Sequence, residues 1–382
     1  MILPAANLTL LIGRALPIPA PSWLMDSFES AQFDVTDKGV SGFEMQFESG
    51  RDGGLVGALD YPHLLRTTLR PFSRVIIIAT LRAIPRVVFD GVLTNIQSQS
   101  SSTPGGMRIK VTGEDLSFFM DRSEEAKTHP ASPDIAIVTK ILSKYAFLGL
   151  RPQVIPPPNF SPPPISRKPT QKETDLKYLR TLAEKHNSVF FIKPGPLPLT
   201  GTAYWGPAPR LGLPQPALTQ NMGPMTNVKS LSFQNKAEQP AVFAGVVQDS
   251  DFTTPQPEFT YFPTTIPLAP VPSLLTALPY VQRKKVSESN GDRYNDAISK
   301  AQAGTNRSTE DAITATGELD VTTYGRILEP RKLVGVRGVG FTFDGLYYVK
   351  QVSHRITRGS YMQSFTLTRD GTGSLLPILP VI

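Results

Sequence analysis

The feature that most constrains this chain is a tripeptide, Phe-Asp-Gly, that recurs near both ends, at Phe89–Gly91 and Phe343–Gly345. Each copy precedes a strand-like run, a turn of small or polar residues and a second strand-like run. These runs are VLTNIQSQ, SSTPGG and MRIKVT in the first copy, and LYYVKQVSHRI, TRGS and YMQSFTLT in the second. The recurrence indicates a β-unit duplicated within one chain, with chance recurrence as the alternative.

The Asp-Gly dipeptides are typical of hairpin turns, because both residue types tolerate positive φ. We therefore predict hairpin turns at Asp90, Gly91, Asp344 and Gly345. A chain with two similar β-domains can build a ring whose apparent symmetry exceeds its number of subunits. The duplication therefore indicates a structural component of an assembly and not an enzyme with an active site.

Hydrophobic periodicity divides the chain into a β-rich beginning, a helical insertion, a Pro-rich middle and a β-rich end. The predicted parts are a first β-barrel domain (1–115), an α/β insertion domain (116–193), a Pro-rich connector and peripheral segment (194–317), and a second β-barrel domain completed by strands from the connector (318–382). The predicted fold class is therefore mixed β with an α/β insertion, in which two tube-like β-barrels are joined by the insert and the connector.

Strand patterns are clearest near the two ends of the chain. Phe43, Met45 and Phe47 alternate with polar residues, which predicts a strand with one buried face. The run from 74 to 81 is apolar enough to be a strand buried on both faces. In the last strand, Tyr361, Gln363, Phe365 and Leu367 share one face.

Helix signals lie in the predicted insertion. Ser132 is a candidate N-cap before Pro133, and Thr170 with Glu173 has the spacing of a capping box. The second helix carries an apolar stripe of Leu176, Leu179, Leu182 and Ala183. The stretch from 294 to 303 is helix-like and polar, and we predict that solvent surrounds it.

Several kinds of chemistry are disfavoured. The chain has no Cys, and its four His share no spacing typical of metal ligands. The glycines of GVRGVG (335–340) precede a strand and not a helix, so we interpret them as turn glycines. No Gly-x-Ser-x-Gly motif and no phosphate loop is present. We predict no catalytic residue, no metal ligand, no cofactor and no enzymatic activity.

Positive charge gathers near the end of the chain. The net charge is +7, and between 326 and 369 eight basic residues stand against two acidic ones. Arg337, Lys350, Arg355 and Arg358 are candidates for a surface that faces a partner or a channel. A solvated sheet whose basic side chains discourage edge pairing is the alternative.

No run is long and apolar enough to be a transmembrane helix. The apolar N-terminal run MILPAANLTLLIG contains Pro4 and lacks a basic leading region, so we predict a first strand and not a signal peptide.

The order of several segments resembles one family. These segments are Gly113-Glu114-Asp115-Leu116, Met120-Asp121-Arg122, Ser132-Pro133-Asp134-Ile135, Thr174-Asp175-Leu176-Lys177-Tyr178-Leu179-Arg180, Leu182-Ala183-Glu184, Val189-Phe190-Phe191-Ile192, Tyr204-Trp205-Gly206-Pro207, Asn221-Met222-Gly223-Pro224, Gly345-Leu346-Tyr347-Tyr348-Val349 and Ser364-Phe365-Thr366-Leu367. Together they resemble the phage late control protein D family, which includes baseplate hubs of contractile phage tails and the hub portion of VgrG proteins.

The resemblance implies a homotrimer in which each subunit carries two barrel-like domains. Three subunits would then adapt a hexameric inner tube to a trimeric spike. The implied partners are further copies of this chain, the inner tube protein, a spike protein and other baseplate components, with no small-molecule substrate and with nucleic acid only as passing cargo. Because the sequence ends at Ile382, soon after the second β-unit, we expect the spike to be a separate polypeptide. The protein would be made in the cytoplasm and become part of a virion tail or injection particle.

Two other functions remain open. Glu44, Glu48, Glu124 and Glu125 could supply the paired carboxylates of a tail-tip cell-wall hydrolase. The basic C-terminal unit could bind nucleic acid, with Tyr347 and Tyr348 stacking on bases. The same tyrosines are also typical of a β-barrel wall.

Overall fold

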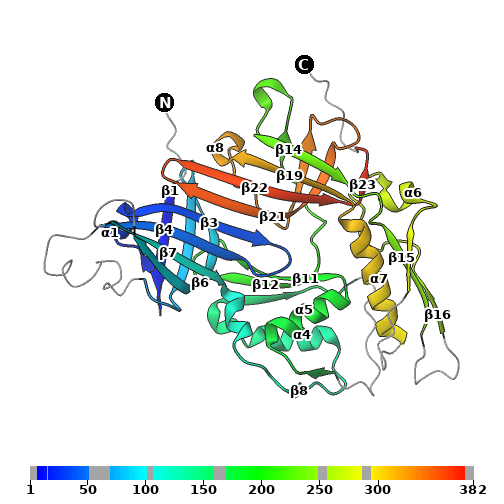
Figure 1. Ribbon diagram of the computed structural model, residues 1–382. Helices are drawn as coiled ribbons and strands as arrows, with labels where there is room; N and C mark the ends of the chain where they lie inside the picture. Colours follow the sequence, from blue (N-terminus) through cyan, green and yellow to red (C-terminus); the bar gives the residue numbers. More distant parts are fainter. Residues whose placement is uncertain are drawn as a thin grey trace.

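The structure, a computed structural model, describes residues 7–14, 16–50, 69–100, 106–157, 169–247, 256–285 and 294–374 (Figure 1). No helix in these ranges is both long and apolar enough to cross a membrane. The N-terminal strands, the C-terminal strands and the insertion surround the centre of the molecule, and helix α7 lies to one side.

The first β-region is built from neighbouring antiparallel strands in the order β3-β4-β7-β6-β5-β1-β2. Its elements are β1 (Asn7–Gly13), β2 (Ile18–Pro19), α1 (Ser22–Asp26), β3 (Phe28–Thr36), β4 (Gly42–Gly50), β5 (Arg74–Leu81), β6 (Ile84–Ser100) and β7 (Gly106–Asp115). Phe43, Met45 and Phe47 of β4 point into the core as their alternation predicts. In β5, the consecutive residues Ile76 and Ile77 are both fully buried, so that both faces of this strand are covered.

The second β-region contains strands from the connector as well as from the end of the chain. Its elements are β13 (Gln215–Thr219), η3 (Gly223–Met225), β14 (Ser230–Asn235), β19 (Ile313–Asp320), α8 (Val321–Tyr324), β20 (Leu333–Arg337), β21 (Gly345–Thr357) and β22 (Ser360–Arg369). Strand β13 runs parallel to β20, and the other strand pairs of this region are antiparallel. The alternation of β22 is confirmed, because Tyr361, Gln363, Phe365 and Leu367 are all buried.

The two β-regions form one sheet. β21 pairs with β3 over seven residue pairs, from Gln351↔Thr36 to Thr357↔Ser30, and the result is a 13-stranded sheet. Buried side chains from Leu10 to Leu367 pack in a single common core. The predicted mixed β class with an α/β insertion is confirmed. Within the described strands, however, no pairing closes either region into a barrel, because the edge of β3 is taken up by β21.

The two Phe-Asp-Gly tripeptides occupy different positions. Asp90 and Gly91 lie inside β6 and not in a turn, so the predicted hairpin turn there is wrong. Asp90 is buried and accepts hydrogen bonds from Nε and Nη2 of Arg74 on β5, at 2.8 and 2.7 Å. Asp344 and Gly345 lead from a turn into β21. A bulge follows Gly91 by three residues and Gly345 by five, so the two copies also differ in where the strand is interrupted. The duplication of a β-unit stays a prediction.

The insertion has a core of its own, formed by helices α4 and α5 against a sheet in the order β11-β12-β9. Its elements are η1 (Leu116–Asp121), β8 (Lys127–Thr128), α4 (Asp134–Ser143), η2 (Ala146–Leu148), β9 (Leu150–Val154), β10 (Thr170–Gln171), α5 (Asp175–Lys185), β11 (Ser188–Pro194) and β12 (Gly201–Pro207). Trp205 of β12 is fully buried and donates its indole N–H to the carbonyl of Leu179 at 3.1 Å. The unit therefore extends to Pro207, beyond the predicted boundary at 193.

The helix caps differ from the predicted ones. Pro133 is the N-cap of α4, and Ser132 instead donates its hydroxyl to the carbonyl of Pro130. Thr174 caps α5 by accepting the backbone N–H of Lys177 at 3.3 Å, while Thr170 lies in β10. The apolar stripe of α5 is confirmed, because its four predicted residues are all buried.

The peripheral segment packs against the insertion. Its elements are β15 (Ala241–Val247), β16 (Gln256–Phe259), β17 (Val271–Pro272), α6 (Ser273–Ala277), β18 (Gln282–Lys285) and α7 (Tyr294–Glu310), and β17 pairs with β23 (Gly371–Thr372). Helix α7 is longer and less solvated than predicted. Ala297 and Ala301 are buried against Phe243 of β15, and a Cβ at Gly304 would come within 2.5 Å of the same ring. Small residues therefore allow this polar helix to pack closely on β15.

Candidate functional site

The candidate site is the junction where β3, β21 and the insertion meet. At the β3–β21 seam, the rings of Phe33 and His354 stack with their centroids 4.2 Å apart. The ring nitrogen Nδ1 of His354 lies 2.7 Å from the hydroxyl of Tyr361 on β22. Complete burial lowers the pKa of His354 to about 3, so that its imidazole is neutral at physiological pH.

Arg331 connects all three parts of the junction. Its Nε donates to the carbonyl of Thr36 at the end of β3 at 3.1 Å, and its Nη1 donates to the carbonyl of Ile192 on β11 at 3.0 Å. Its guanidinium lies 4.0 Å from the ring centre of Phe191, and its backbone N–H donates to Val349 of β21 at 2.7 Å. Burial lowers the pKa of Arg331 to about 10, which leaves it charged at neutral pH.

A small polar cavity lies beside Arg331. It is lined by Asp37, Arg210 and Tyr348, among others. Asp37 Oδ1, Tyr348 Oη, and Nε and Nη1 of Arg210 are buried without a hydrogen-bond partner among the described residues. Burial raises the pKa of Asp37 to about 6, although nearby Lys38 and Lys350 oppose the shift. The junction therefore contains a carboxyl group that titrates close to the physiological range.

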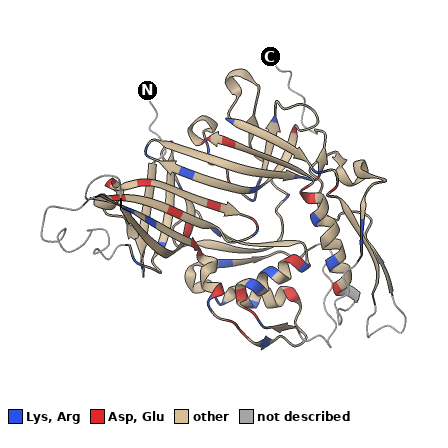
Figure 2. Cartoon of the chain, in the orientation of Figure 1, with Lys and Arg blue, Asp and Glu red and all other residues tan. Residues whose placement is uncertain are grey.

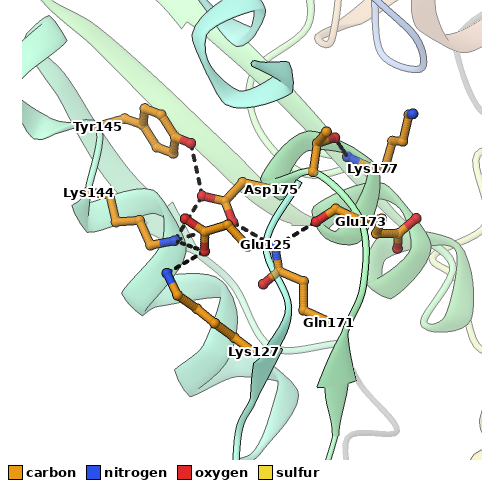
Figure 3. A network of polar contacts seen from close by, with 9 residues as sticks. Glu125, Lys127, Lys144, Tyr145, Gln171, Glu173, Asp175 and Lys177 are labelled. Atoms are coloured by element: carbon orange, nitrogen blue, oxygen red, sulfur yellow. Dashed lines mark hydrogen bonds and ion pairs between the residues drawn. The ribbon is translucent and has the colours of Figure 1, made fainter. Parts of the chain in front are cut away.

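A second polar network holds the insertion together (Figure 3). Asp175, at the first position of α5, is buried and accepts hydrogen bonds from Lys144 Nζ and Tyr145 Oη, both at 2.9 Å, and from Gln171 Nε2 at 2.8 Å. Lys144 also contacts Glu125 at 2.8 Å. Burial, together with the hydrogen bond to Asp175, raises the pKa of Tyr145, so the phenol stays protonated and donates. These contacts join α4, α5 and β10.

Three further acidic residues, in the segments that carry the family resemblance, have structural partners. Asp115 accepts the backbone N–H groups of Ser41 and Ser117, and Asp121 accepts the hydroxyl of Thr174 at 2.5 Å. Asp134 lies 3.0 Å from Lys185 Nζ. These segments therefore position the strands and helices of the insertion, and their carboxylates are occupied in doing so.

The four predicted basic residues do not form one patch. Arg337 ends β20, beside the first residue of β21, and Arg358 follows the last residue of β21. The 13 residues of β21 separate them, which corresponds to about 40 Å of extended chain. Lys350 is paired with Asp311, and Arg358 donates to the carbonyl of Phe28 at 2.9 Å. Arg355 is exposed near the C-terminal end of β21. Figure 2 shows the basic positions of these strands scattered along their length.

The candidate catalytic carboxylates are not brought together as an acid–base pair. Glu44 is paired with Lys110 at 2.8 Å, and Glu125 with Lys127 and Lys144. Hydrogen bonds from these lysines lower the pKa of both carboxyl groups, whereas a general acid needs a raised pKa. Glu48 and Glu124 are exposed. Tyr347 and Tyr348 are buried, so their rings are not available to stack on bases.

Three arginines at buried positions were not predicted. Arg331 and Arg210 line the junction, and Arg369 donates to the carbonyls of Thr342, Asp344, Gly371 and Gly373. Arg side chains are usually exposed to solvent, so composition and spacing gave no signal for these contacts. Among the described residues, no group of three or more His, Cys, Asp and Glu side chains could hold a metal ion.

Comparison with known proteins identifies the fold. No protein-family profile matches the sequence, and no curated protein matches it. A tail protein from Neisseria meningitidis MC58 is similar in structure, with a TM-score of 0.64 and 13% identity, over 96% of this chain and 97% of that chain. The 43 kDa tail protein of prophage MuSo2 from Shewanella oneidensis has a TM-score of 0.64 and 11% identity, over 96% and 100%.

Similarity extends to secretion machinery. An Escherichia coli component of the type VI secretion system, described as structurally similar to T4 tail proteins gp27 and gp5, has a TM-score of 0.54 and 13% identity, over 93% of this chain and 77% of that chain. A chain of the Francisella PdpA–VgrG complex has a TM-score of 0.58 and 10% identity, over 100% and 55%. This chain therefore has the fold of phage tail proteins and VgrG-like secretion components, consistent with the baseplate hub family that its sequence resembles.

Proposed function

We propose that this chain is the structural hub of a contractile tail or injection particle, in which three copies adapt a hexameric inner tube to a trimeric spike. The observation that carries the proposal is the β3–β21 pairing, which joins both β-regions of one chain in a single sheet with a single core. Each subunit would then present two β-regions side by side, and a trimer would present six. The fold shared with tail proteins and VgrG-like components supports this role.

The proposed role is not enzymatic. Glu44 and Glu125 are paired with lysines, and Asp115 and Asp121, in the segments that carry the family resemblance, are hydrogen-bonded within the fold. These contacts stabilise local structure and lower the pKa of Glu44 and Glu125, whereas a general acid needs a raised pKa. The neighbouring folds belong to tail and baseplate proteins, which favours the same conclusion.

Of the four basic residues, Arg355 is the one that we propose for a surface facing a partner or the channel. It is exposed near the C-terminal end of β21, whereas Lys350 and Arg358 are already engaged within the chain. Arg337, at the end of β20, would lie at the margin of such a surface. The protein would be made in the cytoplasm and become part of the assembled tail or particle.

Size-exclusion chromatography with light scattering tests the trimer. The expected mass is three times the 41.7 kDa of one chain. Purified particles provide the second readout, in which the chain should cofractionate and cross-link with both the tube and the spike protein. A monomer in solution that is also missing from purified particles would contradict the proposal. Zymography on cell walls tests the hydrolase alternative, which requires lysis that is lost in Glu→Gln variants.

A further inference from the structure

Two cavities lie on either side of the turn that follows β11. One, of about 450 Å³, is bounded by the beginning of β6 and by residues 327–331. The other, of about 870 Å³, is bounded by the insertion, residues 207–213 and α7. Lys193, Pro194, Gly195, Pro196 and Arg331 line both cavities, so the two are neighbours along one depression, which we call the β11 groove.

The walls of the β11 groove are apolar and rigid. Ile84, Leu211 and Leu213 line it with 61%, 75% and 94% of their surface exposed, although side chains of this kind are normally buried. The groove is also rich in proline, with Pro85, Pro156, Pro194, Pro196, Pro207, Pro209 and Pro330. Fixed proline backbones reduce the entropy lost when a ligand is bound.

Positive charge in the groove exceeds negative charge. Three cations share the single carboxylate of Glu329: Lys332 at 2.7 Å, Arg86 at 2.8 Å and Lys193 at 3.8 Å. Burial lowers the pKa of Lys193, and the neighbouring cations add to this effect. Within the described ranges, two positive charges at this end therefore lack a matching carboxylate.

The other end of the groove contains Arg210. This side chain is 6% exposed, and its Nε and Nη1 have no hydrogen-bond partner within the described part of the chain. Its remaining nitrogen, Nη2, lies 3.9 Å from Glu310. A buried guanidinium with unmade hydrogen bonds is costly, and an acceptor supplied by a ligand would reduce that cost.

We propose that the β11 groove binds an extended segment of another protein in which carboxylates alternate with apolar side chains. Successive side chains of an extended segment point in opposite directions, so one set can meet the cations while the other packs on Leu211 and Leu213. The inference stands without the trimer, because it depends only on this groove. Nucleic acid fits less well, because the rings of Phe191 and Tyr204 are buried and cannot stack on bases.

Fluorescence anisotropy on the full chain tests the inference. The probe is a labelled peptide of repeating Glu-Val-Glu-Pro, compared with peptides of equal length that carry Gln or Lys in place of Glu. We expect saturable binding of the Glu peptide, weaker binding of the Gln peptide and none of the Lys peptide. A Lys193→Glu/Lys332→Glu variant should bind the Glu peptide about tenfold more weakly.

Two further variants separate the groove from general electrostatics. Lys140→Glu/Lys177→Glu changes the net charge equally on the exposed faces of α4 and α5, and it should bind like the wild type. Leu211→Ser/Leu213→Ser leaves the charge unchanged and should lose binding. No binding of the Glu peptide, or equal binding by the Lys193/Lys332 variant and its control, would overturn the inference. An oligothymidylate that displaces the Glu peptide, with an affinity that falls steeply as salt is added, would also overturn the inference, because it would indicate a nucleic-acid site.

Discussion

The two β-regions contrast in what holds them together. In the first, alternating apolar residues such as Phe43, Met45 and Phe47 form the core, and all neighbouring strands are antiparallel. In the second, buried polar side chains bind loops that are distant in sequence. Gln363, for example, exchanges two hydrogen bonds of 2.9 Å with the backbone of Leu328. The stability of the first region therefore depends on the packing of its core, whereas the stability of the second also depends on specific hydrogen bonds.

Among the changes that test this contrast, replacing Arg369 should cause the largest loss of stability. Arg369→Met keeps much of the apolar bulk but removes the donors to four backbone carbonyls. Unfolding by urea should show a loss of about 3–5 kcal/mol. The matched change in the first region, Phe47→Leu, keeps an apolar side chain and should cost about 1–2 kcal/mol. If both variants lose the same free energy of unfolding, the two β-regions do not differ in how much they depend on buried hydrogen bonds.

The seam between the regions can be tested with cysteines, because the chain has none of its own. Asp34 of β3 and Ser353 of β21 are register partners, so Asp34→Cys/Ser353→Cys should form a disulfide. Since it closes a long loop, we expect a gain of about 2–4 kcal/mol over the reduced form. Cysteines at 34 and 357, which are not partners, serve as the control. Failure of the first pair to oxidise would contradict the seam.

The polar cavity of the junction predicts a dependence of stability on pH. The pKa of Asp37 is about 6 in the folded chain, compared with 3.8 as its ordinary value. The folded state therefore holds the proton more tightly, and stability should fall as pH rises from about 4 to about 6. The Asp37→Asn variant should not show this fall. Above pH 6 its free energy of unfolding should exceed that of the wild type by about 2 kcal/mol. Urea unfolding at several pH values measures the free energy of unfolding of both proteins. If the wild type and the variant show the same dependence on pH, Asp37 does not titrate in a buried site.

The smallest effect is expected at the exposed face of the first region. Glu44 and Lys110 form an ion pair with about one third of each side chain exposed. Glu44→Gln should change the free energy of unfolding by no more than about 0.5 kcal/mol, because solvent screens such pairs. Urea unfolding in low and high salt checks this value. A large loss would show that polar contacts also dominate the first region.

The sequence predicted the local patterns and missed the contacts between distant segments. The alternation of β4 and β22 and the stripe of α5 could be predicted, because strand and helix periods act over a few residues. The turn at Asp90 was wrong because Arg74, on the neighbouring strand, holds that carboxylate inside the sheet. Arg331 contacts Thr36 and Ile192, which lie far away along the chain, and no local pattern marks such contacts.

Electron cryomicroscopy of an intact particle would show how many copies of this chain form the hub and how they meet the tube. We expect three copies, each with β3 paired to β21 and with both β-regions facing the ring of tube subunits. Six copies, or three copies in which only one β-region of each chain faces the tube, would contradict this expectation.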